Sequence, residues 1–414
     1  MKLRTGFVGF AVAAALAMAL PARADVRIAQ LDGLSGAFGN VGEQQRASLQ
    51  ASIDAVNAAG GVKGEKLRLV SIDGKGNPQE TLKAFREAVD QGIRIVTQGN
   101  SSSVAAALVK AVDKYNRRHP DDPVLYLDHS ALDNDLTGKD CSFWHFRFDA
   151  SVAMKTRAVM KKLVPDQSVH KIYLINQNYA LGQQASEDAK AELAKLRPDV
   201  KVVGDELHPV GQVKDFAPYV SKIAESGADT VFTANWGNDL SLLVKAIKDA
   251  GLKLHIYTFY GSGYGAPAAM GPAAIGRIYV ASEWNQNIQP DPIEGFMDVY
   301  QRKTGHDWLF QRIRTMVFLL DAAMEKAGTR DVKAIAYAME GLQVDAGTGP
   351  AWARKSDHQM LQRLYISRAV KTAAAGGPAD AKYDAEHSGT AFVTDMVLEP
   401  QQTAVETSCR MKRP

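Results

Sequence analysis

The sequence predicts an α/β fold in which β-strands and α-helices alternate in two series along the chain. The first series runs from Asp25 to about His129, and the second begins after the segment CSFWHFRF at Cys141. In both, apolar runs typical of buried strands are followed by amphipathic segments with the 3.6-residue period of helices. Regular alternation of this kind indicates parallel sheets covered by helices.

The first series contains four expected strands and three expected helices. The strand segments are VRIAQL from Val26, KLRLVSID from Lys66, IRIVTQ from Ile93 and PVLYLD from Pro123. The helices are expected to begin at Glu43, Pro78 and Ser101. Pro78 suits a first helical turn, and the side-chain oxygens of Ser101 to Ser103 can cap the third helix.

The second series is of similar size. Its strand segments are KIYLIN from Lys171, VKVVG from Val200, DTVFTAN from Asp229 and HIYTFY from His255, and its helices are expected from Ser151, Ala180, Asp215 and Asp239. The remainder holds GRIYVAS from Gly276, helices from Pro292 and around Leu309–Met324, and LQRLYISRAV from Leu361. It is too short for a third full domain, so we expect the two lobes to share it.

Composition and charge exclude several classes of protein. The 414 residues are 46% hydrophobic and 23% charged with two cysteines, which excludes a disordered chain, collagen and a small disulfide-stapled scaffold. Lys plus Arg number 49 and Asp plus Glu 46, without a long basic block, so no nucleic-acid or anionic-membrane surface is indicated. The basic end CRMKRP is expected to be a solvated tail.

The first 24 residues have the pattern of a secretory signal peptide. Lys2 and Arg4 precede an apolar run of 14 residues from Phe7 to Leu20, and Ala22-Arg23-Ala24 forms a small-residue cleavage site before Asp25. The run is shorter than the roughly 20 residues that a membrane-spanning helix needs. No cysteine lies near the cleavage point, so we expect a periplasmic protein without a lipid anchor.

Cys141 and Cys409 form an even pair in a protein expected to be exported. An oxidising compartment makes a disulfide between them the favoured state over two free thiols. Such a bridge would hold the C-terminal tail to the body of the protein.

Sequence signals for catalysis, nucleotides or metals are weak. Gly33, Gly36, Gly39 and Gly42 match neither G-x-G-x-x-G nor a Walker loop, which leaves a mobile loop whose backbone approaches a ligand in a cleft. The nine histidines show no metal-ligand spacing, and no G-x-S-x-G elbow occurs. We therefore expect no enzyme activity, no metal and no cofactor.

Candidate binding residues lie where expected strands end. In GNSSSV, three serines and the free amides of a helix N-terminus follow a strand, which suits a carboxylate ligand or plain helix capping. Aromatic residues follow other strands or lie in their loops, where ligands of open α/β sheets bind. These aromatic residues are Phe38, Tyr179, Trp236, Phe259 and Tyr260.

Several stretches resemble the type I periplasmic solute-binding proteins of the leucine/isoleucine/valine-binding branch. The resemblance begins with LSGAFGNVGEQQRASLQASIDAVNAAGGVKGEKLRLVSIDGKGNPQETLKAFREAVDQG and GNSSSVAAALVKAV. It continues through LDHSALDNDLT, INQNYALG, ADTVFTANWGNDL, IKDAGL and TGPAWARKSDHQ, and so covers nearly all of the chain after residue 24.

The resemblance implies an architecture of two doubly wound parallel-sheet lobes joined by three crossover segments. After the signal peptide at 1–24, lobe 1 would comprise residues 25–147 plus 280–360. Lobe 2 would comprise 148–279 plus 361–400, and 401–414 would be the tail. Proteins of this family close around a solute by a hinge motion.

The resemblance also implies ligand-binding residues in the cleft. The serine turn, Asn100 with Ser101, Ser102 and Ser103, matches the family's carboxylate clamp, and Ser130 with Ala131 matches a second anchoring turn. Tyr179 and Trp236 match aromatic residues that cover the ligand. Leu132 and Tyr260 stand where amino-acid binders use a threonine and an acidic residue to hold the ligand's ammonium group.

The expected function is therefore that of the binding component of a branched-chain amino-acid-type ABC importer. Its ligand would be a small hydrophobic carboxylate, either a branched-chain amino acid or an aromatic acid. Its partners would be a membrane permease and ATPase, and the protein would be a monomer. The alternatives are an amide- or urea-type binding or sensing protein and a secreted hydrolase that uses one of the serines.

Arg312 and Arg314 lie on an expected helix whose other face is apolar. Either could reach the cleft as another carboxylate partner. A solvated or interlobe ion pair is the favoured alternative.

Overall fold

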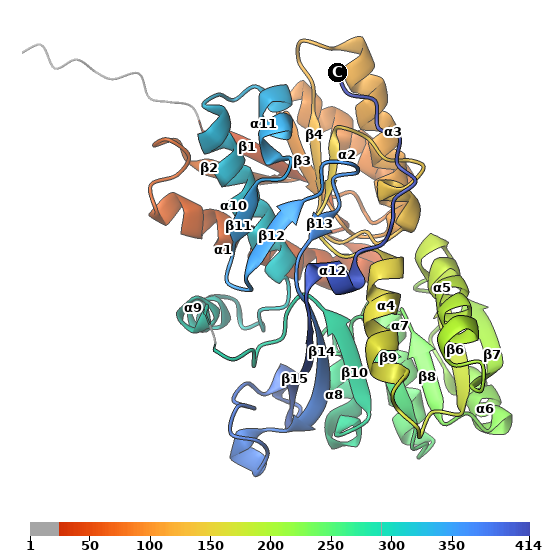
Figure 1. Cartoon of the computed structure of the whole chain (residues 1–414). Coiled ribbons are helices and arrows are strands. Elements are labelled where there is room, and N and C mark those ends of the chain that lie inside the picture. Colours follow the sequence, from red (N-terminus) through yellow and green to blue (C-terminus); the bar gives the residue numbers. More distant parts are fainter. Residues whose placement is uncertain (1–24, 291) are drawn as a thin grey trace, which may run out of the picture.

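The computed structural model describes residues 25–290 and 292–414, and the expected signal peptide at 1–24 lies outside them. Within these two ranges, no helix is both long and apolar enough to cross a membrane. The chain forms two lobes, each built on its own large sheet, and Figure 1 shows them one above the other.

The first lobe contains a five-stranded sheet in the order β2-β1-β3-β4-β5, and every neighbouring pair is parallel. Its strands are β1 (Val26–Gln30), β2 (Leu67–Ser71), β3 (Ile95–Gln98), β4 (Leu125–Asp128) and β5 (His145–Arg147). Its alternating helices are α1 (Gly39–Ala58), α2 (Pro78–Asp90) and α3 (Ser102–Arg118). All residues of β3 and β4 are buried, as in a sheet covered on both faces.

The second lobe contains a seven-stranded sheet in the order β15-β14-β10-β9-β8-β6-β7. Its strands are β6 (Lys171–Gln177), β7 (Lys201–His208), β8 (Thr230–Thr233), β9 (His255–Thr258), β10 (Ile278–Ser282), β14 (Leu364–Lys371) and β15 (Thr390–Leu398). Its helices are α4 (Val152–Leu163), α5 (Ala180–Leu196), α6 (Ala217–Ser226), α7 (Gly237–Asp249) and α8 (Ala266–Met270). The sheet is parallel except at β14 and β15, which pair antiparallel.

Smaller elements complete the first lobe and the region between the lobes. Helix α10 packs against α1 and α11, beside a three-stranded antiparallel sheet. These elements are α9 (Glu294–Thr304), α10 (Gln311–Ala327), α11 (Val332–Met339), β11 (Gln343–Asp345), β12 (Pro350–Ala353) and β13 (Met360–Leu361).

Between β5 and β14 the chain passes between the two lobes three times, which agrees with the expected architecture. It leaves β5 for α4, leaves β10 for the segment that contains α9, and leaves β13 for β14. The expected boundary between residues 279 and 280 falls inside β10 and is wrong. Residues up to Ser282 stay in the second sheet, because β10 is an inner strand that pairs with β9 on one side and β14 on the other.

The predicted disulfide holds the C-terminal tail to the first lobe, and most residues of the basic end after Cys409 are exposed, as expected. After α12 (Pro400–Thr403), the chain returns to the first lobe, where a disulfide joins Cys409 to Cys141. Thr407 Oγ1 donates a hydrogen bond to the Thr137 carbonyl at 2.7 Å. Arg413 forms an ion pair with Glu340. The tail follows β15 of the second lobe, and these contacts attach it to the first lobe.

Replacing both Cys141 and Cys409 with Ser should lower the free energy of unfolding by about 2–4 kcal/mol. The bridge spans 268 residues of sequence, so its loss gives the unfolded chain more conformational freedom. Urea unfolding of the double variant and of the wild type under reducing conditions should give the same decrease. An unchanged free energy would mean that noncovalent contacts alone hold the tail.

Candidate functional site

A cavity lies between the two lobes, at the carboxyl ends of strands from both sheets. Ligands of open α/β sheets bind at these strand ends. Among its lining residues are eight of the predicted site residues: Asn100, Ser101, Ser102, Ser130, Ala131, Tyr179, Trp236 and Tyr260. The others are Val41, Gln45, Gly99, Leu181, Tyr264 and Arg312.

Two predicted site residues, Ser103 and Phe38, do not line this cavity. Ser103 is exposed, and its Oγ lies 2.8 Å from Ser101 Oγ, with which it shares a hydrogen bond. The Phe38 ring stacks on Trp236 with 4.4 Å between the ring centroids. Phe38 belongs to the first lobe and Trp236 to the second. This ring contact therefore joins the two lobes next to the cavity, which Trp236 lines.

Asp32, two residues after the end of β1, holds the serine turn in place through hydrogen bonds to its backbone. Its Oδ1 accepts hydrogen bonds from the backbone N–H groups of Gly99 at 2.8 Å and Asn100 at 3.1 Å. Burial alone would raise the pKa of Asp32, but the neighbouring His129 and these hydrogen bonds lower it overall. Asp32 therefore stays ionised, and a charged acceptor fixes the loop that leads into α3.

The three serines do not cap α3 as predicted. Ser101 is the N-cap residue, but its side chain makes no capping hydrogen bond. Ser102 Oγ instead accepts hydrogen bonds from the backbone N–H groups of Leu132 and Asp133, both at 3.3 Å. The start of α3 therefore faces the cavity without a side-chain cap, and a helix N-terminus of this kind attracts anions.

Buried polar atoms without partners mark the first-lobe wall of the cavity. Both side-chain atoms of Asn100, Oδ1 and Nδ2, and the Oε1 of Gln45 have no hydrogen-bond partner within the described ranges. Asn100 is 3% exposed and Gln45 is 2% exposed, so solvent does not compensate. Burying such groups unpaired is costly, and it indicates a site where a bound molecule supplies the missing partners.

The second anchoring turn lines the cavity, but both of its backbone amides already have an acceptor in the protein. Asp128 Oδ1 accepts the N–H groups of Ser130 at 3.1 Å and Ala131 at 2.8 Å. Leu132 stands where amino-acid binders of the family use a threonine to hold the ligand's ammonium group. It is fully buried and does not line the cavity. This turn therefore contributes the Ser130 side chain to the cavity wall, and neither of its two backbone amides is free to bind a ligand.

The structure places a histidine beside a serine, which sequence analysis did not foresee. His129 Nδ1 lies 3.0 Å from Ser130 Oγ, and His129 Nε2 lies 3.0 Å from Asp32 Oδ2. Ser130 Oγ also accepts a hydrogen bond from Arg312 Nε at 2.9 Å. His129 is 0% exposed and packs against Gly99, where a Cβ would lie 2.5 Å from the ring. The ring is therefore held as a packed support of the serine turn.

The glycines after β1 serve the fold of the chain itself. A Cβ on Gly42 would lie 2.1 Å from the Gly33 carbonyl oxygen, and a Cβ on Gly33 would lie 2.5 Å from the Gly76 nitrogen. Backbone segments therefore approach one another closely at these positions. The sequence predicted that the backbone at Gly33 and Gly42 approaches a ligand. In the structure this backbone instead approaches other parts of the chain, namely α1 and the loop after β2.

Aromatic residues of the second lobe form the opposite wall. Trp236 Nε1 donates a hydrogen bond to the Tyr179 hydroxyl at 2.7 Å, so the proton of that hydroxyl is left to be donated elsewhere. Burial raises the pKa of Tyr179, which keeps the hydroxyl protonated. The wall can thus cover an apolar group and donate one hydrogen bond.

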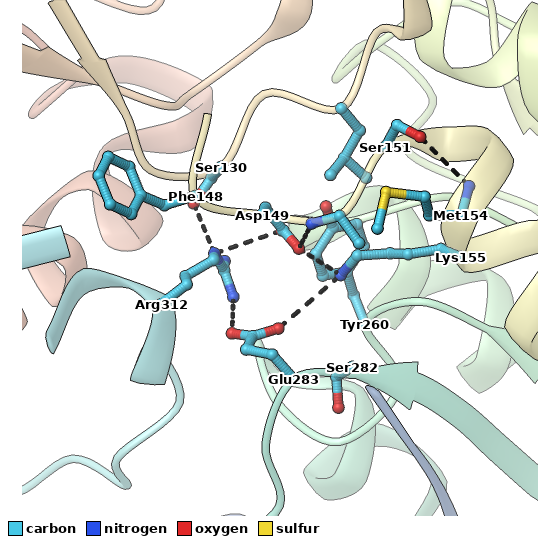
Figure 2. Close-up of polar contacts among 12 residues, drawn as sticks. Ser130, Phe148, Asp149, Ser151, Met154, Lys155, Tyr260, Ser282, Glu283 and Arg312 are labelled. Carbon is cyan, nitrogen blue, oxygen red and sulfur yellow. Dashed lines mark hydrogen bonds and ion pairs between the residues drawn. The ribbon is translucent and has the colours of Figure 1, made fainter. Parts of the chain in front are cut away.

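Four buried charged side chains connect the lobes beside this cavity. Arg312 on α10 lies 2.7 Å from Glu283, just after β10, and 3.3 Å from Asp149, just after β5. Lys155 on α4 lies 2.9 Å from Asp149 and 4.0 Å from Glu283. Figure 2 shows Arg312 and Lys155 reaching the two carboxylates from opposite sides. We call these four residues the interlobe charge cluster.

The interlobe charge cluster favours ionised Glu283. Burial would raise the pKa of Glu283, but the charges of Arg312 and Lys155 and the hydrogen bond from Arg312 lower it overall. Arg312 thus forms the interlobe ion pair that sequence analysis favoured. Its side chain also contributes to the cavity wall. No Asp or Glu is among the described residues that line the cavity.

Arg314, two residues farther along α10, does not line the cavity. Its guanidinium lies over the rings of Phe296 at 4.3 Å and Phe318 at 4.2 Å, and its Nε donates to the Ala346 carbonyl at 3.1 Å. Burial lowers the pKa of Arg314 to about 10. Arg314 is therefore a packing residue and is not placed to contact a ligand in this cavity.

Sequence analysis missed several polar residues that shape the site: Asp32, Gln45, Asp128, His129, Asp149, Lys155 and Glu283. Asp32 and Glu283 directly follow apolar strand segments, and the same strand-end signal that selected Trp236 could have selected them. Gln45 and Lys155 lie inside helices, where a single polar residue carries no local signal. The described residues contain no group of three or more His, Cys, Asp or Glu that could hold a metal ion.

Replacing Ser101 with Gly should raise the free energy of unfolding by about 1 kcal/mol. Ser101 has φ 77° and ψ 120°, a conformation that glycine adopts without the steric cost of a Cβ. Chemical denaturation measures the difference. Ser103→Gly, in the first turn of the same helix, is the matched control and should lower stability by about 1 kcal/mol. Equal losses in both variants would contradict the strain at Ser101.

Replacing Arg312 with Gln should lower the free energy of unfolding at pH 7 by about 3–5 kcal/mol, because two buried carboxylates would share one cation. In the wild type, the lowered pKa of Glu283 gives stability that is lost as the pH falls through that pKa. In the variant the pKa of Glu283 rises. The difference in the free energy of unfolding between the variant and the wild type should therefore shrink as the pH falls from 7 to 4.

Arg314→Gln is the control for this prediction, because no carboxylate contributes to the pKa of Arg314. The free energy of unfolding that Arg314→Gln loses relative to the wild type should stay constant between pH 7 and pH 4. Denaturation curves at several pH values test both variants, and a deficit of Arg312→Gln that does not change with pH would contradict the prediction.

The family model described as periplasmic binding protein matches residues 25–377. The chain is 32% identical to the Leu/Ile/Val-binding protein homolog 4 of Brucella melitensis biotype 1, over 100% of both chains. It is 26% identical to the Leu/Ile/Val-binding protein homolog 8 of Brucella abortus, over 74% of this chain and 77% of that protein.

Solved structures share the same two-lobe fold. The closed conformation of the leucine-, isoleucine-, valine-, threonine- and alanine-binding protein from Brucella ovis superposes with a TM-score of 0.83 at 30% identity, over 94% of this chain and 100% of that one. An R. palustris solute-binding protein in complex with benzoate matches in fold, with a TM-score of 0.77 at 17% identity over 93% and 99% of the chains. The sequence matches and the fold together show that this chain belongs to the periplasmic binding protein family.

Proposed function

We propose that the protein binds a small hydrophobic carboxylate in the cavity between its lobes. The observation that carries this proposal is the set of unpartnered buried polar atoms on Asn100 and Gln45, beside the uncapped start of α3. A ligand carboxylate can accept from the Asn100 amide and the α3 amides, while Tyr179 and Trp236 cover its apolar part. Two or three such bonds and one buried apolar group suffice for micromolar affinity, about −8 kcal/mol.

Both a branched-chain amino acid and an aromatic acid fit this description, and they differ at the ammonium group. The cavity wall offers a guanidinium and no carboxylate, so an ammonium would rely on neutral oxygens such as Gln45 Oε1. An acid without an amine meets no such cost. The relatives named for leucine, isoleucine and valine support the amino-acid alternative, so both ligand classes belong in the test.

The role we infer is that of the periplasmic binding component of an ABC importer. Membership of the periplasmic binding protein family supports delivery of the bound solute to a membrane permease and its ATPase. The signal-peptide pattern of residues 1–24 supports export to the periplasm. We infer no catalytic step, because His129 and Asp32 support the serine turn and Ser130 Oγ is held by Arg312.

A thermal-shift screen tests this function on protein that has been unfolded and refolded to remove bound molecules. A ligand at 100 times its dissociation constant adds about 2.7 kcal/mol and should raise the melting temperature clearly. The screen should contain leucine, valine, benzoate and the amides leucinamide and benzamide. We expect the carboxylates to raise the melting temperature and the amides not to.

Replacing Asn100 with Ala should weaken binding of the carboxylate found in the screen by tenfold or more, because about 1.5–3 kcal/mol of charge-assisted hydrogen bonding is lost. The free energy of unfolding should not fall, because the removed atoms have no partner in the protein. Asn40→Ala, at an exposed position of α1, is the control and should bind normally. Calorimetric titration measures both variants.

Three outcomes would contradict the proposal. Shifts by the amides alone would favour an amide-binding protein, and turnover of a nitrophenyl ester abolished by Ser130→Ala would favour a hydrolase. If Asn100→Ala binds the carboxylate found in the screen as tightly as the wild type does, the serine turn is not part of the ligand site.

A further inference from the structure

A second cavity adjoins the first. The two share three residues, Tyr260, Tyr264 and Arg312, which form a common wall. The remaining lining residues come from α4, from the loop after β9, from β10 and the segment that follows it, and from β15. They are Lys155, Phe259, Ser262, Ser282, Trp284, Asn285, Gln286, Leu309 and Phe392.

The second cavity presents hydrogen-bond donors and positive charge, and no carboxylate. Trp284 is 3% exposed, and its Nε1 has no acceptor within the described part of the chain. Lys155 and Arg312 contribute to the lining, whereas their counterions Asp149 and Glu283 do not. Because a buried donor without an acceptor is costly, Trp284 indicates that an acceptor from outside the chain enters this cavity.

In the common wall, ion pairs fix Arg312, whereas few hydrogen bonds within the described part of the chain hold the hydroxyl groups of Tyr260 and Tyr264. The Lys155 ammonium lies 5.1 Å from the Tyr260 ring centroid, and the structure records no hydrogen bond to the Tyr260 hydroxyl within residues 25–290 and 292–414. Among the described residues, the Tyr264 hydroxyl has one hydrogen bond, a long one of 3.4 Å from Arg312. Rotation of the Tyr260 ring would therefore break no hydrogen bond of the protein.

We propose that the two cavities form one elongated binding site. The ligand would be a hydrophobic carboxylate that carries a second hydrogen-bond acceptor at its far end. Its carboxylate lies at the serine turn, its body passes Tyr260 and Tyr264, and its distal carbonyl or carboxylate oxygen accepts from Trp284 Nε1. This inference rests on the proposed function and extends it to a longer class of ligand.

The test compares three aromatic acids by calorimetric titration of refolded protein. Benzoate carries the carboxylate and the ring without a distal group, whereas 4-acetylbenzoate adds an acceptor and 4-isopropylbenzoate adds the same bulk without one. We expect 4-acetylbenzoate to bind about tenfold more tightly than 4-isopropylbenzoate, the effect of one satisfied buried hydrogen bond.

Trp284→Phe removes the Nε1 donor and keeps an aromatic ring. This variant should lose the preference for the acetyl over the isopropyl compound and keep its affinity for benzoate. Trp308→Phe is the matched control, because Trp308 belongs to the same hydrophobic cluster, donates its Nε1 to Gln311 and lines neither cavity. It should keep the acetyl preference even if it is less stable.

The outcomes separate this inference from the proposed function. If neither leucine nor any benzoate binds, the proposed function itself is wrong. If leucine or benzoate binds but both 4-substituted benzoates are excluded, the function stands and the elongated site is wrong. Equal affinities for the acetyl and isopropyl compounds, or an acetyl preference that survives Trp284→Phe, would overturn the role of Trp284.

Discussion

The interlobe charge cluster is the constraint on which the arrangement of the two lobes depends. Its four members come from α4, α10 and the segments just after β5 and β10, and all are buried. A buried charge without a partner is strongly unfavourable, so each residue requires the others in place. The contacts therefore hold two of the three crossovers in register with helices from both lobes.

The same cluster determines the electrostatics of the space between the lobes. Its carboxylates pair with Arg312 and Lys155 and stay out of the cavity walls, while both cations contribute to those walls. On the first-lobe side, Asp32 and Asp128 hold the two turns through their backbone amides. Acidic side chains thus support the site from behind, and the surfaces that meet a ligand are donors, neutral amides and aromatic rings.

Much of the fold could be predicted because its signals are local. Helix α2 begins at Pro78 with Asn77 as its cap, as the sequence indicates, because the Asn77 side chain reaches the Glu80 amide three residues away. Strand β15 was not predicted, because the residues of this antiparallel edge strand are partly exposed and lack a continuous apolar run. Asn100, Ser101 and Ser102 of the serine turn line the cavity and Ser103 does not, and Ser102 bonds to residues 30 and 31 positions away and not to its own helix.

The sequence by itself determined the two alternating series, the family and the strand ends that supply Asn100, Tyr179, Trp236 and Tyr260. Periodicity, capping and strand ends depend on neighbours within a few positions, so one sequence is sufficient to show them. Only the tertiary structure decided that Glu283 pairs with Arg312, that Phe38 meets Trp236 across the cleft and that Trp284 borders a second cavity. These contacts join residues that lie far apart along the chain, and their energies depend on burial, which no local pattern encodes.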